Sequence, residues 1–329
     1  MHEADRHCPS RRQFLLEGAA ATAALVAGSR LARAADEGPV VAIVRDRTKK
    51  AIEGQNADAT IVQNLVDRAV MTLSGKDDVA KAWATYVSPK DKVAVKFNGL
   101  FQNATTHPAV VFAVTNGLIK AGVDPANIVV YDRNDGALKV AGYTLNRQGA
   151  GPRVYGTGDQ YGDAVKAGPV ETRISRILLE ADVLVNVPMM KTHVLSGISG
   201  ALKNHLGTVP NAGAFHKDDQ KRDTCLYVAD VNALEPIKTK HRLCICDALY
   251  ALFDGGPQYR PQFRWDYYGI LAAVDPVALD ATLADLIKAK RIEAGKSPYH
   301  NAILHVERAA KLGLGIADLT KIKPVEVEV

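Results

Sequence analysis

The chain has 329 residues, of which 47% are hydrophobic and 23% charged, and its formal net charge is +5. This composition is ordinary for a globular protein and excludes a disordered or collagen-like chain. In the first 34 residues, five arginines against three carboxylates account for +2 of that charge. The rest of the chain has only a small net positive charge, which indicates no dedicated nucleic-acid surface, so we expect no nucleic-acid partner.

The N-terminal segment has the order of a secretion signal. Arg11 and Arg12 precede an apolar run at 18–28, and small residues lead up to Ala34, where a signal peptidase would cleave. A short basic amphipathic helix or a membrane anchor is the alternative, but the run is short and rich in Ala and Gly for a bilayer span. We expect a twin-arginine signal peptide at 1–34. The mature protein would be periplasmic or secreted in a bacterium, with the twin-arginine translocon as its partner during export and no transmembrane anchor after cleavage.

Short apolar runs rich in Val and Ile recur along the rest of the chain. They are nearly continuous rather than alternating, and they lie at 40–44, 92–97, 128–131, 183–187 and 243–246. Continuous runs of this kind are typical of strands that are buried on both faces of a parallel sheet.

Helical patterns separate these runs. Apolar spacing predicts helices at 60–73, between Pro108 and Gly122, at 276–288 with Asp275 as its N-cap, and at 302–312. The alternation predicts an α/β fold with a largely parallel sheet and helices on both faces. We expect a single domain at 35–329. The Gly-rich stretch at 142–162 is a candidate surface loop or a boundary between two lobes.

Three cysteines remain after the expected cleavage: Cys225, Cys244 and Cys246. The number is odd, so at least one thiol stays free or pairs outside the chain. Cys244 and Cys246 share one face of a predicted strand, which favours small buried side chains over a metal pair. No C-x-x-C motif is present, so the spacing argues against an iron–sulfur cluster.

Polar residues follow four of the predicted strands. They include Lys96 and Asn98, then Asp132, then the segment 186–193, and Asp247. In an open α/β sheet, ligands bind beyond the carboxyl ends of the strands, which predicts one shared site. The alternative is that each residue only caps a helix or faces solvent in a loop.

Segment 191–207 is the densest in polar and small residues. We expect a short helix to begin near Ser199 and Gly200, so that its backbone N–H groups approach an anion. Lys203 and Asn204 would then face the sheet. A lysine in a site with little water can act as a base or form a covalent bond. The alternative is a solvated lysine on an ordinary helix start.

The order of these motifs resembles a bacterial and archaeal family catalogued as domain of unknown function 362. The likeness spans roughly 40–314, and it rests on Lys96, Asn98, the segments 106–108, 188–193 and 199–207, Asp247, the pair 256–257 and the segment 275–280. Some members carry ferredoxin-type cysteine motifs, which this chain lacks. The resemblance implies a fold but no settled reaction.

A shorter stretch, from His193 through Ser199 and Gly200 to Lys203, is similar to a segment of nickel-pincer lactate racemases. That likeness implies that His107 and His193 exchange protons with a substrate carbon from opposite faces. Lys203 would hold a pincer nucleotide and His216 would hold a divalent metal of the nickel type. Lys191 and Asn204 are not part of that pattern.

The sequence therefore predicts an exported, cofactor- or metal-dependent enzyme that moves a proton or hydride on a small hydroxy or carboxylic acid, racemase-like or oxidoreductase-like. Paired imidazoles and cationic lysines suit an anionic ligand. The expected catalytic residues are His107, His193 and Lys191, and the expected metal ligands are His216 and Asp247. The expected cofactor-binding residues are Lys203, Asn204, Ser199, Gly200, Lys96, Asn98 and Asp132. The alternative is a periplasmic anion-binding or carrier protein without catalysis.

Overall fold

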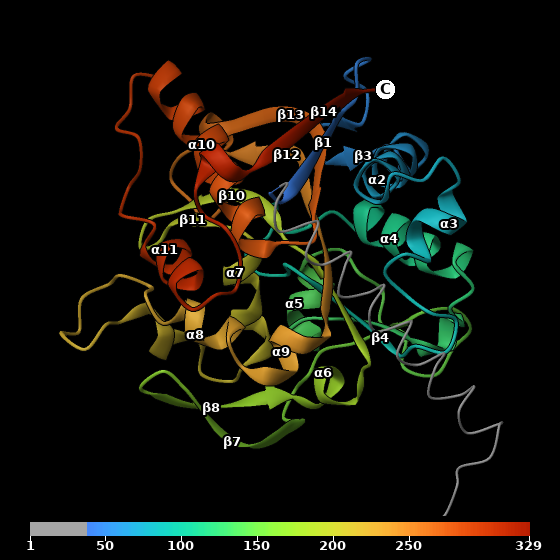
Figure 1. The fold of residues 1–329 in the computed structure, drawn as a ribbon, viewed down its shortest axis with the longest axis horizontal. Helices are drawn as coiled ribbons and strands as arrows, with labels where there is room; N and C mark the ends of the chain where they lie inside the picture. The colour runs from blue at the N-terminus through green and yellow to red at the C-terminus, as the bar shows by residue number, and fades with distance from the viewer. Residues whose placement is uncertain (1–37) are drawn as a thin grey trace, which may run out of the picture. The chain divides into compact units, whose positions relative to one another are not determined.

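The computed structural model describes residues 38–329, and Val40–Val329 forms one compact unit (Figure 1). The expected signal peptide, its cleavage site after Ala34 and Cys8 lie outside the described residues. Within the part that is described, no helix is both long enough and apolar enough to cross a membrane.

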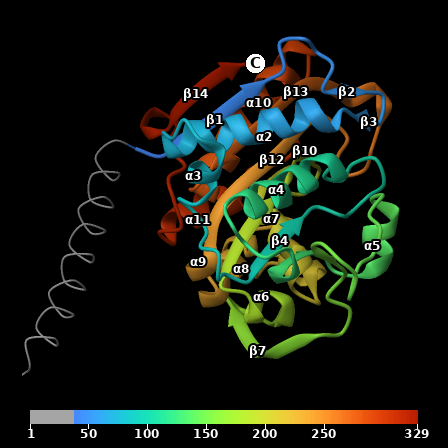
Figure 2. The same ribbon diagram turned by 90° about the vertical axis from the view of Figure 1, so that its right-hand side faces the viewer.

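A mostly parallel sheet runs through this unit (Figure 2). Its main order among the described residues is β14 (Lys323–Glu328), β1 (Val40–Arg45), β13 (Arg264–Ala273), β12 (His241–Leu252), β9 (Val183–Val187), β4 (Val93–Phe97), β5 (Ile128–Tyr131) and β6 (Arg153–Val154). Strands β12, β9, β4, β5 and β6 run parallel to one another, and β1 runs parallel to β14, whereas β13 is antiparallel to both β1 and β12. The predicted α/β class and its five predicted strands are confirmed.

Helices cover both faces of the sheet, as predicted (Figure 1). One core contains side chains of α2 (Ala59–Ser74), α3 (Val79–Trp83) and α4 (Pro108–Lys120), and the other contains side chains of α7 (Ala201–Asn204), α8 (Val228–Asn232), α9 (Glu235–Lys240), α10 (Pro276–Glu293) and α11 (Leu304–Lys311). Alternate residues of β12 enter opposite cores: Cys244 and Cys246 enter one, Leu243 and Ile245 the other. The two cysteines are therefore small buried side chains on one face, as expected.

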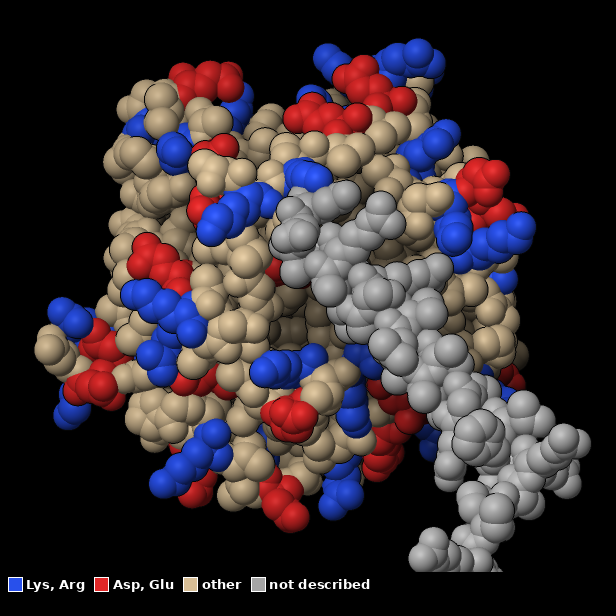
Figure 3. Space-filling view, in the orientation of Figure 1, with Lys and Arg blue, Asp and Glu red and all other residues tan. Residues whose placement is uncertain are grey.

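The remaining elements are short. They are β2 (Ile52–Glu53), β3 (Asn56–Ala57), α5 (Asp135–Val140), the hairpin of β7 (Tyr161–Ala167) and β8 (Val170–Ser175), and α6 (Arg176–Glu180). The Gly-rich stretch 142–162 holds β6 and the first residues of β7 between irregular segments. Lys and Arg side chains alternate with Asp and Glu over the face seen in Figure 3 and do not gather into a patch.

The register of the parallel strands brings their carboxyl ends together. Lys96, near the end of β4, lies opposite Tyr131 of β5 on one side and Asn186 of β9 on the other. Asp132 directly follows β5. The polar residues at these strand ends therefore reach the same edge of the sheet.

After β9 the chain forms β10 (Met189–His193) and β11 (Gly197–Ser199), which pair antiparallel and lead into the four-residue helix α7. Strand β10 also runs parallel to β12. Strand β10 carries Lys191 and His193, whose side chains are buried. Because these residues are polar, β10 has no continuous apolar run and was not predicted as a strand.

The helix start near Ser199 differs from the expectation. The backbone N–H groups of Ala201 and Leu202 donate to the carboxylate of Asp280 at 2.6 and 3.0 Å. A Cβ on Gly200 would lie 2.0 Å from Asp280 Oδ1, so this close approach requires glycine. The expectation that these amides are offered to an anionic ligand is wrong, because a carboxylate of α10 already binds them.

A buried ion-pair cluster fixes the loop after β12 beside β10. Asp254 accepts a hydrogen bond from Arg291 Nη1 at 2.5 Å and also pairs with His300. Two residues further on, the N–H of Gly256 donates to Thr192 Oγ1 at 3.1 Å. The cluster therefore ties α10 to the strand that carries His193.

We expect the variant Asp254→Asn to be less stable than the wild type at neutral pH, by about 1–2 kcal/mol after allowance for screening. Burial opposes the effect, but hydrogen bonds from Lys296 and Arg291 hold the pKa of Asp254 at about 2, below its ordinary value of 3.8. A depressed carboxyl pKa stabilises the fold above pH 4, and this contribution is lost as the pH falls through 2. Urea unfolding at pH 7, 4 and 2.5 measures it. Asp285→Asn is the control, because it alters an exposed ion pair on α10, the helix that carries Arg291. A loss of stability in Asp254→Asn that is equal at all three pH values would contradict the ion-pair account.

Candidate functional site

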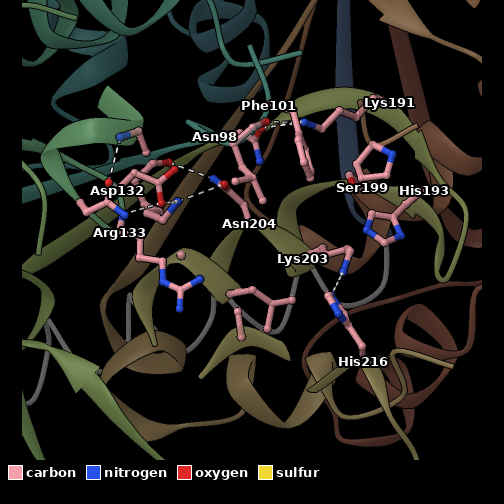
Figure 4. A pocket seen from close by; sticks show the side chains of 18 residues that line it. Asn98, Phe101, Asp132, Arg133, Lys191, His193, Ser199, Lys203, Asn204 and His216 are labelled. Atoms are coloured by element: carbon pink, nitrogen blue, oxygen red, sulfur yellow. Dashed lines mark hydrogen bonds and ion pairs between the residues drawn. The ribbon is translucent and has the colours of Figure 1, made fainter. Parts of the chain in front are cut away.

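A cavity of about 230 Å³ lies at the carboxyl ends of the parallel strands (Figure 4). Nine of the twelve expected site residues line it: Lys96, Asn98, Asp132, Lys191, His193, Ser199, Lys203, Asn204 and His216. The other three expected residues, His107, Gly200 and Asp247, are not among its lining residues. The cavity is smaller than the roughly 300–1,000 Å³ typical of sites for drug-sized ligands, so it suits an acid of a few carbons better than a nucleotide.

Lys96 and Asp132 form a buried ion pair at the cavity wall. Lys96 is 1% exposed, and its Nζ lies 3.0 Å from Asp132 Oδ1 and 3.2 Å from Asn204 Oδ1. The second carboxylate oxygen accepts the N–H of Gly99 at 2.6 Å. Burial lowers the pKa of Lys96, and the charge of Asp132 opposes this shift. A Cβ on Gly207 would lie 2.1 Å from Asp132 Oδ1, so glycine is needed where this backbone crosses the pair.

Asn204 belongs to a buried amide network beneath the cavity. Its Nδ2 donates to Lys96 O at 3.1 Å and to Asn186 Oδ1 at 2.7 Å. Asn186 in turn donates to Ala201 O at 2.8 Å. Both ends of the Asn204 amide therefore have partners, and the network holds α7 against β4 and β9.

Lys191 anchors the loop that follows β4. Its Nζ donates to Asn98 Oδ1 at 2.8 Å, to Leu100 O at 3.3 Å and to Ala104 O. Burial, opposed by the charge of Asp132 and assisted by that of Lys203, lowers the pKa of Lys191 to about 7. The three oxygen acceptors use all three donors of the ammonium group. Lys191 thus contributes positive charge and holds the loop in place; a direct part in catalysis stays a prediction.

Lys203 has different surroundings. Its Nζ lies 2.9 Å from His216 Nε2 and 3.8 Å from Cys225 Sγ. Burial lowers the pKa of Lys203. Burial and the charge of Lys203 together lower the pKa of His216 to about 4. The amine therefore sits beside an imidazole and a thiol rather than beside a carboxylate.

His193 completes this side of the cavity, and Figure 4 shows it close to Lys203 and His216. Its ring centre lies 5.8 Å from that of His216. The N–H of Leu195 donates to His193 Nδ1 at 3.2 Å, which places the ring proton of the neutral form on Nε2. Burial and the charge of Lys203 lower the pKa of His193 to about 2, so the ring is neutral at physiological pH.

His107 and Asp247 form a separate buried pair. Asp247 Oδ2 lies 2.7 Å from His107 Nδ1 and accepts the N–H of His107 at 2.7 Å. The His107 ring packs edge-on against Tyr250, and within the described part of the chain its Nε2 has no hydrogen-bond partner. Asp247 therefore orients His107, and the structure does not bring either residue to the cavity surface.

No group of three or more His, Cys, Asp or Glu residues in the described part of the chain is arranged to hold a metal ion. His216 lines the cavity and contacts Lys203, whereas Asp247 binds His107. The two expected metal ligands thus do not make a site together. A bound metal stays a prediction.

Four residues near the site were not predicted from the sequence to belong to it. Arg133 and Phe101 line the cavity, and the place of Arg133 directly after Asp132 is a signal that could have identified it. Cys225 contacts Lys203, and His305 is fully buried with no partner for either ring nitrogen among the described residues. Cys225 and His305 lie far along the chain and have no local motif, so only the fold brings them here.

Comparisons with known proteins agree with this picture at the level of the family. The family model described as Domain of unknown function (DUF362) matches residues 93–285. A thylakoid-associated protein of Synechocystis sp. is 28% identical over 217 residues, which are 62% of this chain and 65% of that protein. The lactate racemase apoprotein of Thermoanaerobacterium thermosaccharolyticum is 11% identical and superposes with a TM-score of 0.43, covering 75% of this chain and 56% of that chain. The chain thus spans less than two thirds of the length of either protein.

Proposed function

The chain belongs to the DUF362 family, and we propose that it is an enzyme that moves a proton or a hydride on a small hydroxy or carboxylic acid. The observation that carries this proposal is the composition of the cavity wall. Three buried lysines and two neutral imidazoles line it, whereas Asp132 is the one acidic residue among the described residues of the lining, and it is paired with Lys96.

This excess of basic groups favours an anionic ligand, because a bound carboxylate stabilises their protonated forms. Lys191 and Lys203 are 2% and 8% exposed, and neither forms an ion pair with a carboxylate in the described part of the chain. A buried cation without a counter-ion is costly, so a carboxylate that enters the cavity lowers that cost. Its binding should raise the pKa of both lysines and be accompanied by proton uptake near neutral pH.

The same groups can move a proton on the bound acid. The ring of His193 and the amine of Lys203 are both desolvated and neutral, and an anion that enters beside them raises the pKa of both. His193 would then take up a proton on Nδ1, in place of the hydrogen bond from the N–H of Leu195. The lysines would stabilise the negative charge that develops when a C–H bond next to a carboxylate is broken.

We expect the protein to exchange the C2 hydrogen of a 2-hydroxy acid with solvent. Proton NMR in D₂O, with a panel of glycolate, lactate and malate, follows the loss of that signal. His193→Gln removes the proposed base, and the exchange rate should fall by about 10²-fold or more. Lys139→Gln, at an exposed position on α5, should leave the rate unchanged. Equal rates in His193→Gln and the wild type would contradict the assignment of His193.

The same measurement decides between the enzyme and the anion-binding protein. Thermal stabilisation by these acids without hydrogen exchange would support a binding or carrier protein. Neither stabilisation nor exchange would overturn the proposed function in both forms.

We also propose that the protein acts outside the cytoplasm. The paired Arg11 and Arg12 before an apolar run support passage through the twin-arginine translocon. That pathway carries proteins that are already folded, which is compatible with a cavity built from segments as distant as Lys96 and His216.

A further inference from the structure

We infer that Lys203 is a nucleophile that forms an imine with the carbonyl carbon of a small 2-oxo acid. This inference rests on the proposed function, because it names the class of acid and the atom that the acid would meet. It follows from the different partners of the three buried lysines that line the cavity.

The three lysines are not equivalent. The Nζ of Lys96 pairs with a carboxylate, and the Nζ of Lys191 donates to three oxygen atoms. The Nζ of Lys203 has only the Nε2 atom of His216, at 2.9 Å, and the Sγ atom of Cys225, at 3.8 Å, as hydrogen-bond partners in the described part of the chain. An ammonium group in such a place lacks strong acceptors, so these surroundings favour the free amine.

The neighbouring thiol is a poorer nucleophile here. Burial raises the pKa of Cys225, which keeps the sulfur protonated, whereas burial lowers the pKa of Lys203. A thiol reacts as its thiolate and an amine reacts in its neutral form. Burial therefore makes Cys225 a weaker nucleophile and Lys203 a stronger one. Of the two residues, Lys203 lines the cavity.

The chemistry balances without an oxidant or a cofactor. The amine of Lys203 attacks the carbonyl carbon, and a C–N bond forms as the carbonyl π bond opens to an alkoxide, which takes one of the two protons of the nitrogen and becomes a hydroxyl group. His216 Nε2 lies within proton-transfer distance of Nζ; it accepts the other proton from the nitrogen and returns it to the hydroxyl group, which leaves as water as the C=N bond forms. The products are the imine and one water molecule.

The imine would activate the C–H bond at C3 of the oxo acid, because C2 itself carries no hydrogen. A protonated imine withdraws electrons from C3, so a base can remove a proton from it. His193 lies on the same side of the cavity, with its ring 5.8 Å from that of His216. The charges of Lys191 and Lys96 favour the carboxylate of the oxo acid in the rest of the cavity.

Reductive trapping of the full chain tests the inference. We would incubate the protein with pyruvate and sodium cyanoborohydride and then measure its intact mass and its modified peptides. We expect one carboxyethyl group per chain, located on Lys203. Burial lowers the pKa of Lys203 and so raises the neutral fraction of its amine, so Lys203 should react faster than exposed Lys139. Lys203→Arg should lose this label, and Lys139→Arg should keep it.

Peptide mapping of the wild type gives the answer even where Lys203→Arg fails to fold. Label spread over exposed lysines, or none at Lys203, would overturn the imine inference. If hydroxy acids still exchange their C2 hydrogen in that case, the proposed function stands alone. If pyruvate labels Lys203 but no hydroxy acid exchanges or stabilises the protein, the imine inference stands and the proposed hydroxy-acid chemistry falls.

Discussion

The variant Lys96→Met should lower the free energy of unfolding by about 3–5 kcal/mol. Lys96 is almost fully buried, and its Nζ lies 3.0 Å from Asp132 Oδ1. Methionine fills a similar volume but leaves the carboxylate of Asp132 buried without its counter-ion. Urea denaturation followed by circular dichroism measures the change.

Two further variants show whether the loss comes from the stranded charge. Lys92→Met alters an exposed lysine just before the same strand and should change stability by less than about 0.5 kcal/mol. The double variant Lys96→Met with Asp132→Asn should regain at least half of the loss, because the amide keeps an acceptor for Gly99 and carries no charge. If Lys96→Met lowers the free energy of unfolding no more than Lys92→Met does, Asp132 does not depend on Lys96 as its counter-ion.

Much of the fold could be predicted because its central strands are buried on both faces. Val-rich, nearly continuous apolar runs such as 183–187 are typical of strands buried on both faces, and helices between such strands are typical of a parallel order. Strand β13 begins with the sequence RWDYY, in which polar and aromatic residues mix, and β14 is mostly exposed and reads KPVEVE. In β13 the apolar run is limited to its last four residues, ILAA, and β14 has no such run, so neither strand was predicted and the antiparallel part of the sheet was missed with them.

The candidate site could be predicted to the extent that it lies at strand ends. Asn98 and Asp132 follow the neighbouring strands β4 and β5, His193 ends β10, and all three residues line one cavity as expected. Asp247 belongs to β12 and also lies at this end of the sheet, yet its side chain turns to His107. The order of elements determines which strand ends meet, but it does not determine which side chains face the same space.

The remaining parts of the site depend on contacts between distant segments. Cys225 meets Lys203, and Asp280 meets Ala201 and Leu202 across 79 and 78 positions of sequence. Asp280 appeared in the sequence only as the last residue of a motif that starts with the N-cap Asp275, whose capping role is confirmed by hydrogen bonds to Val277 and Ala278. Nothing in local spacing indicates that the second aspartate caps a different helix.

The variant Asp280→Ala should lower the free energy of unfolding by about 2–5 kcal/mol, because it leaves the N–H groups of Ala201 and Leu202 buried without acceptors. Asp280 is fully buried, and these two hydrogen bonds are 2.6 and 3.0 Å long. Asp285→Ala, at a half-exposed site one turn further along α10, should cost less than about 0.5 kcal/mol. Urea unfolding compares the two, and equal losses would contradict the capping role.

The stability of the protein should depend on pH through the carboxyl group of Asp280. Burial raises the pKa of Asp280 to about 7 from 3.8, although the N–H groups of Leu202 and Ala201 oppose the shift. Between these values the folded chain holds a proton that the unfolded chain has released. The contribution of Asp280 to stability is therefore complete below pH 4 and declines as the pH rises to 7. Asp280→Asn cannot titrate, so its stability relative to the wild type should improve steadily between pH 4 and pH 7. A constant difference across that range would show that Asp280 is already ionised at pH 4, with its two N–H partners outweighing the cost of burial.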